Sequence, residues 1–211
     1  MKPLNNTITG WTAIAAGIAT LSIPIGLAVL AETGSLSNIV GALGDVLGAI
    51  AAVLIIPVLV AAGGIVMAKH KALGLSAQSL GVIGALIDFT QYVLFIGGII
   101  TYEQSLPWNS TARGLIGIVV LTYGLLNRKD PKLKRLYVWL SIALGVVMAP
   151  GVMAVMGVNP LGNVFDELAQ GGTLAEANPI LIALLFIMAP IFVLGWPIWL
   201  LWTGRLFLKE K

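Results

Sequence analysis

The sequence contains no cysteine in its 211 residues. This absence excludes disulfide bonds, thiolate metal sites, thiol nucleophiles and lipid attachment through sulfur. Histidine is almost absent as well, because His70 is the single copy and stands between Lys69 and Lys71. One histidine cannot build a zinc or haem site alone, so we interpret His70 as a surface residue beside lipid headgroups.

Charged residues are also scarce. They make up 10% of the chain, against about 25% in soluble domains, whereas hydrophobic residues make up 58%. A chain with so little charge needs lipid as its solvent. Spans of about 20 residues with short loops use up nearly the whole length, so we expect one membrane-embedded domain over residues 1–211.

Six apolar stretches predict an all-α, polytopic transmembrane helix bundle with six spans, at 10–31, 39–68, 79–101, 112–126, 137–158 and 180–203. The second stretch is long and contains Pro57, which predicts a kinked helix. The fourth is the shortest, with 15 residues. It crosses the bilayer only if Arg113 snorkels outward and Trp108 lies near the headgroups.

The basic residues predict the topology, because Lys and Arg concentrate on the cytoplasmic side of membrane proteins. When the loops are assigned to alternate sides, one side receives eleven basic residues and the other receives Arg113 alone. We therefore expect both termini in the cytoplasm. The eleven are Lys2, Lys69, Lys71, Arg128, Lys129, Lys132, Lys134, Arg135, Arg205, Lys209 and Lys211.

The N-terminal stretch has a second interpretation. Lys2, the apolar run and Val29-Leu30-Ala31 could form a cleaved signal peptide, which would leave five spans. The apolar run is longer than a typical signal core, so we favour a retained helix.

Asp88 lies within the third apolar stretch, near the expected middle of the membrane. No basic residue is assigned to that depth, so desolvation should favour the protonated, neutral carboxyl. Gln91 and Tyr92 follow at three and four residues and share its helix face. Two interpretations remain open for this candidate polar site. Asp88 either accepts protons or binds a ligand, or it is a structural hydrogen-bonding group between helices.

Asp45 is a secondary candidate near the outer end of the second stretch. A structural role is favoured, because water and a helix N-terminus lower the cost of its charge. Gly44, Gly48 and Ala52 around it form a ridge of small residues of the kind that packs helices together.

No other residues predict catalytic, cofactor-binding or metal-binding chemistry. The sequence shows no HExxH motif and no Ser, His and Asp grouping. The methionines at 148, 153, 156 and 188 could be proposed as copper ligands, but methionine more often fills packing gaps. A basic run could bind anionic lipid, although topology already explains it, and nucleic-acid binding has no support. The run contains Arg128, Lys129, Lys132, Lys134 and Arg135.

Aromatic residues gather toward the cytoplasmic interface and read as an aromatic belt. They are Trp11, Tyr137, Trp139, Trp196, Trp199 and Trp202. Trp196 is deeper than a belt requires, so it could line a pocket together with Pro190 and Pro197.

Three short motifs carry a family resemblance: Ile8-Thr9-Gly10-Trp11, Tyr137-Val138-Trp139-Leu140 and the closing run from Trp196 to Arg205. Together they resemble a group of uncharacterised bacterial six-span membrane proteins known as a domain of unknown function. The resemblance implies a bacterial plasma membrane and brings no site residues with it. We therefore expect a non-enzymatic membrane protein with an accessory, sensing or small-ligand-binding role. The alternative is a small proton-coupled transporter or channel that uses Asp88.

Overall fold

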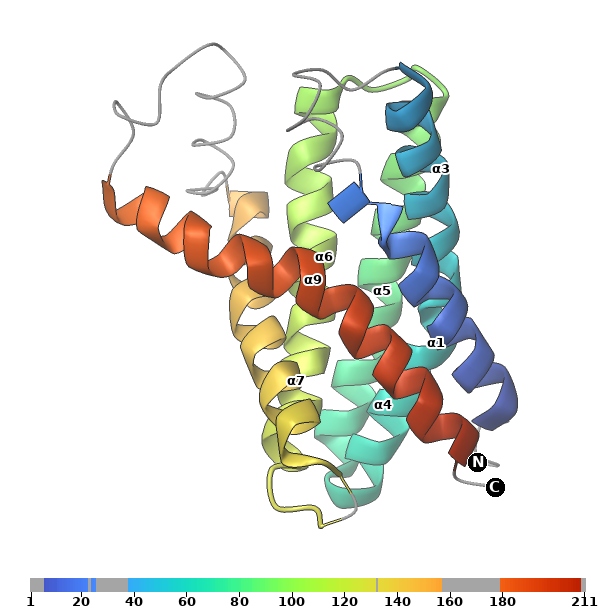
Figure 1. Ribbon diagram of the computed structural model, residues 1–211, viewed down its shortest axis with the longest axis vertical. Helices are drawn as coiled ribbons and strands as arrows, with labels where there is room; N and C mark the ends of the chain where they lie inside the picture. The colour runs from blue at the N-terminus through green and yellow to red at the C-terminus, as the bar shows by residue number, and fades with distance from the viewer. Residues whose placement is uncertain (1–5, 23, 26–37, 132, 157–178, 210–211) are drawn as a thin grey trace.

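The computed structural model describes residues 6–22, 24–25, 38–131, 133–156 and 179–209 (Figure 1). Within these residues every regular element is a helix, which confirms the all-α prediction. The elements are α1 (Asn6–Thr20), α3 (Asn38–Leu54), α4 (Ile56–Lys69), α5 (Lys71–Ile96), α6 (Tyr102–Leu126), α7 (Arg135–Met148), the 3-10 helix η1 (Ala149–Met156) and α9 (Pro179–Lys209).

Five helical segments are long and apolar enough to cross a membrane. They are Gly41–Lys69, Lys71–Ile96, Tyr102–Leu126, Arg135–Ala154 and Ile187–Lys209. They correspond to the second to sixth predicted stretches. The first predicted stretch, 10–31, begins within α1 and continues into residues outside the described part of the chain. The alternative of a signal peptide, cleaved after Ala31, concerns those same residues.

The extent predicted for the fourth span is wrong. It is the 25-residue helix α6, which begins at Tyr102 instead of residue 112. Thr101 and Gln104 form a capping box, in which the Gln104 amide donates to Thr101 Oγ1 at 3.3 Å and the Thr101 amide donates to Gln104 Oε1 at 2.9 Å. This reciprocal cap satisfies two amides that would otherwise lack partners. The extra ten residues give α6 a full spanning length.

The second stretch, for which Pro57 predicts a kinked helix, is divided into α3 and α4. The helix is interrupted at Ile55, and α4 then restarts with Pro57 near its first turn. Proline lacks an amide hydrogen and clashes with the preceding turn, which accounts for the break. Pro150 has the same effect on α7, which ends at Met148 and is followed by the 3-10 helix η1.

Small residues set the spacing between the helices, as the high glycine content predicts. A Cβ on Gly84 of α5 would lie 2.8 Å from the carbonyl oxygen of Ala112 in α6. A Cβ on Gly117 of α6 would lie 2.5 Å from the Cβ of Met148 in α7. Neither position has room for a side chain, so the helix backbones pack in close contact.

One end of the bundle collects the basic residues. The first turn of α1, the α4 to α5 turn, the α6 to α7 connection and the last turn of α9 all lie at this end (Figure 1). Arg113 is the exception among the described basic residues. The eight that lie here are Lys69, Lys71, Arg128, Lys129, Lys134, Arg135, Arg205 and Lys209.

The aromatic belt is only partly present. Trp11 and Trp139 are exposed, at 60% and 58%, as a belt requires. Trp196, Trp199 and Tyr137 are instead buried, so the belt interpretation is wrong for them. Their rings form a stack inside the bundle, with centroids 5.4 Å apart from Trp196 to Trp199 and 6.4 Å apart from Trp199 to Tyr137.

Hydrogen bonds hold this stack between α7 and α9. Trp199 Nε1 donates to Ser141 Oγ at 2.8 Å, and the Tyr137 hydroxyl bonds Thr203 Oγ1 at 2.9 Å. Buried indole and phenol groups need such partners, which explains why these rings lie inside the protein instead of at the headgroups.

Candidate functional site: an ion pair inside the bundle

Arg113 lies inside the bundle because α6 begins early. Eleven residues separate it from Tyr102, which places it about 16 Å along the helix. Its side chain is 12% exposed. The expectation that Arg113 snorkels outward is therefore wrong.

Arg113 forms an ion pair with Asp88 of α5. Arg113 Nε lies 3.3 Å from Asp88 Oδ2, and the Asp88 side chain is 6% exposed. The neutral carboxyl expected at Asp88 depended on the absence of a basic partner at that depth, and this premise is wrong. The carboxyl instead has a cationic partner at 3.3 Å.

The pair lies deep within both helices. Asp88 is about 26 Å along α5 from Lys71 and about 12 Å from Ile96, whereas Arg113 is near the centre of α6. Asp88 therefore lies in the C-terminal half of α5, whereas the predicted stretch that begins at residue 79 placed it near the middle of its span. The difference arises because α5 begins at Lys71, eight residues before the predicted stretch.

Two aromatic residues complete the surroundings of the guanidinium. Arg113 Nη2 donates to the Tyr92 hydroxyl at 3.4 Å, and its Cζ lies 5.5 Å from the centroid of the Phe192 ring. The second distance is within the range of a cation–π interaction. Tyr92 was predicted on the face of Asp88, but Phe192 of α9 was missed because only the tertiary fold brings it here.

Several polar atoms of the site have no hydrogen-bond partner among the described residues. They are Asp88 Oδ1 and Gln91 Nε2, whereas Arg113 Nε meets Asp88 Oδ2 as an ion pair without hydrogen-bond geometry. Asp88 and Gln91 are each 4% exposed, so the polar face predicted on α5 does point into the bundle. Unpartnered buried polar atoms are costly, which distinguishes this cluster from a fully satisfied structural network.

A small cavity borders the ion pair. Its volume is about 10 Å³, and its walls include Thr20 of α1, Ala52 of α3, Asp88, Arg113 and Trp196 of α9. A cavity of about 10 to 15 Å³ on this scale holds one water molecule. Trp196 thus lines a cavity as expected, although Pro190 and Pro197 are not part of its wall.

Asp45 lies apart from the ion pair. It is partly exposed on α3. The ridge predicted beside it is only partly used. A Cβ on Gly48 would lie 2.5 Å from Tyr92 Cζ, and Ala52 is 2% exposed, but a Cβ on Gly44 would meet open space.

Metal binding finds no support in the part of the chain that the structure describes. No three of its His, Asp and Glu side chains gather into a group that could hold a metal ion. Met148 belongs to the hydrophobic core, in agreement with the packing interpretation.

Comparison of the chain with protein-family models, with curated proteins and with solved structures finds no match.

Proposed function

We propose that this chain is a six-span, non-enzymatic protein of a bacterial plasma membrane that senses or binds a small ligand at the Asp88–Arg113 pair. Both termini lie in the cytoplasm. The end of the bundle that carries eight basic residues supports this orientation. With Arg113 inside the bundle, no basic residue of the sequence is left for the opposite side.

The observation that carries the sensing role is the incomplete pairing of a buried charge cluster. The space beside it has room for about one water molecule. A proton also fits this space, and it is the ligand that would change the charge of the pair. Protonation of Asp88 would leave the Arg113 charge without its partner and would weaken the contact between α5 and α6.

The groups that would influence such a proton site come from three helices. Arg113 of α6 and Tyr92 of α5 touch the cluster, and Asp45 lies on α3 one turn before Gly48, whose position faces Tyr92. The cavity wall from α1 and α9 consists of Thr20, Trp196 and Leu200, none of which titrates near neutral pH.

Proton-coupled transport is the second candidate, because a buried ionisable residue inside a span is a typical part of a proton path. It is the less favoured candidate, because a proton path needs further ionisable groups on both sides of Asp88, and the described cavity wall offers none besides the Asp88–Arg113 pair. The basic run of Arg128, Lys129, Lys132, Lys134 and Arg135 is proposed as a contact for anionic lipid at the cytoplasmic surface.

The two candidates differ in whether protons cross the membrane. Trp196 lines the cavity, so its fluorescence reports protonation of Asp88. If the protein is a sensor, its tryptophan fluorescence should change with pH, and this change should be lost in both Trp196→Phe and Asp88→Asn. Proteoliposomes that contain the wild type and an internal pH dye should then show no more proton flux than empty liposomes. Flux in the wild type that Asp88→Asn abolishes would establish transport instead. A titration that is unchanged in Asp88→Asn would remove both candidates.

The topology has its own test, because the absence of cysteine makes every introduced cysteine unique. Lys129→Cys should react with a membrane-impermeant maleimide only after the cytoplasmic face is opened. Ile99→Cys, at an exposed position between α5 and α6, should react in intact cells. The reverse pattern would contradict the proposed orientation.

A further inference from the structure

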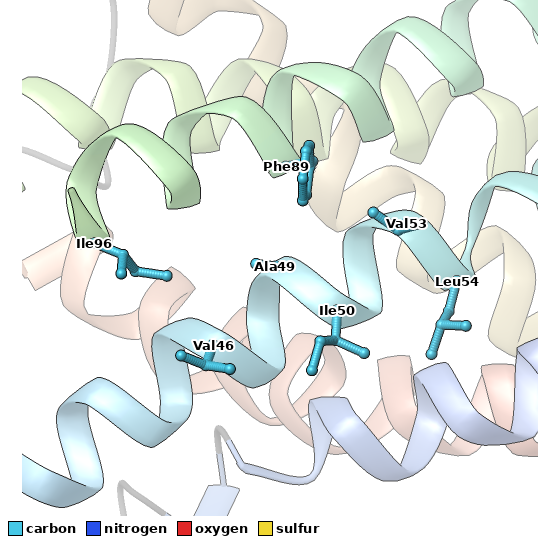
Figure 2. Close-up of a pocket in the computed structure, with 7 residues that line it drawn as sticks. All are labelled: Val46, Ala49, Ile50, Val53, Leu54, Phe89 and Ile96. Carbon is cyan, nitrogen blue, oxygen red and sulfur yellow. The ribbon is translucent and has the colours of Figure 1, made fainter.

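An apolar groove runs along the outside of the bundle between α3 and α5 (Figure 2). Its volume is about 340 Å³. Val46, Ile50 and Val53 of α3 form one wall, and Phe89 and Ile96 of α5 form the other. Every lining residue is apolar.

The location of the groove determines what surrounds it. Both walls belong to segments long and apolar enough to cross a membrane. Val46, Ile50 and Val53 are 42 to 46% exposed, so the groove opens outward and not into the core. Hydrocarbon chains are the solvent at this surface.

The length of the groove matches one leaflet. From Val46 to Leu54 the helix rises about 12 Å, whereas half of a hydrocarbon core is about 15 Å. One acyl chain lying parallel to α3 would therefore fill the groove from one end to the other.

Asp45 supplies the second, independent observation. It immediately precedes Val46 at one end of the groove. None of the described residues donates a hydrogen bond to its carboxylate or forms an ion pair with it. Asp45 lies on the same face of α3 as Gly48, where a Cβ would lie 2.5 Å from Tyr92 Cζ, so this face of α3 points toward α5 and the other wall of the groove.

The depth of Asp45 suits a lipid headgroup. It is 24 residues from Lys69, or about 36 Å along the α3 and α4 segment, which exceeds the roughly 30 Å hydrocarbon core. With Lys69 at one interface, Asp45 lies at the headgroup level of the other.

We infer that this surface is a binding site for a phospholipid with a cationic amine headgroup, of the phosphatidylethanolamine class. The acyl chain lies in the groove, and the ammonium pairs with the Asp45 carboxylate. Burial of apolar surface holds the acyl chain. The negative charge of Asp45 selects this headgroup over an anionic one such as that of phosphatidylglycerol. This site does not depend on the role proposed for Asp88.

The test uses the full chain reconstituted in vesicles of equal phosphatidylethanolamine and phosphatidylglycerol. Lipids retained after mild detergent extraction are counted by native mass spectrometry. The wild type should retain phosphatidylethanolamine over phosphatidylglycerol by about threefold, as expected for one partly exposed ion pair. Asp45→Asn should lower this ratio to about one without lowering the total. Glu103→Gln removes a carboxylate near the same end of the bundle and should leave the ratio unchanged.

The groove itself is tested by Val46→Trp, which fills it and should lower the total retained lipid. Leu43→Trp, on an exposed position of α3 outside the groove, should keep the wild-type total. An equal ratio in the wild type, or an unchanged ratio in Asp45→Asn, would overturn the headgroup assignment. If Val46→Trp changes the number of protein copies per particle instead of the lipid count, the groove holds a second copy of this chain and not a lipid.

Discussion

Removing one charge of the Asp88–Arg113 pair should destabilise the bundle far more than removing both. At a separation of 3.3 Å, two unit charges attract by about 5 kcal/mol at an effective dielectric constant near 20. Asp88→Asn leaves the guanidinium buried without its counter-charge, and losses of this kind are about 3 to 5 kcal/mol. Tyr92 and Phe192 remain beside it, so we expect the lower half of that range.

The double variant Asp88→Asn with Arg113→Gln removes both charges, with Asn the same size as Asp and Gln two heavy atoms smaller than Arg. We expect it to recover at least half of the loss seen in either single variant, because no unpaired charge is left. The assay is equilibrium unfolding in mixed micelles by titration with denaturing detergent. If the effects of the two single variants simply add, the residues are not coupled and the ion pair is not an energetic unit.

Three further predictions concern the parts of the fold that position this pair. Thr101→Ala removes the cap of α6 and should lower the free energy of unfolding by about 1 kcal/mol, measured by the same titration, while Thr122→Ala inside α6 should have a smaller effect. Gly84→Leu places a side chain against the α6 backbone and should prevent folding, visible as loss of a monodisperse peak in size-exclusion chromatography. Trp199→Phe leaves Ser141 Oγ without its donor and should cost about 1 kcal/mol with the helical circular dichroism unchanged.

The sequence predicts the helical class and the polar face of α5 well, because both depend on local periodicity. Hydropathy marks the apolar centres of the spans, and the spacing of Asp88, Gln91 and Tyr92 places them on one face in any helix. The depth of Asp88 along its helix was less accurate, since Lys71 and Ser76 are polar positions that hydropathy assigned to a loop but that the structure includes in α5.

The partner of Asp88 was missed for a related reason. The first turns of α6 carry Glu103, Gln104 and Asn109, so averaging their hydropathy moved the predicted beginning of the helix past them and left Arg113 at a membrane surface. A local signal was present in the Thr101 to Gln104 capping-box spacing, which indicates a helix N-terminus ten residues earlier. Phe192 and the cavity wall depend on how α9 crosses the bundle, and no local pattern predicts that contact.

The burial of this charge pair also bears on its role. Replacing a buried ion pair with apolar residues of similar size is often neutral or stabilising. If these two positions contributed only to packing, leucine at both would therefore give the bundle about the same stability. In this protein one carboxylate oxygen and one amide of the cluster lack partners, and a space of one water molecule lies against them. An arrangement that leaves these atoms unsatisfied gains from a ligand that satisfies them, and stability alone does not account for it. The double variant Asp88→Leu with Arg113→Leu tests this reasoning. We expect it to be as stable as the wild type and to lose the pH response of Trp196 fluorescence. That result would separate the function of the pair from the folding of the bundle.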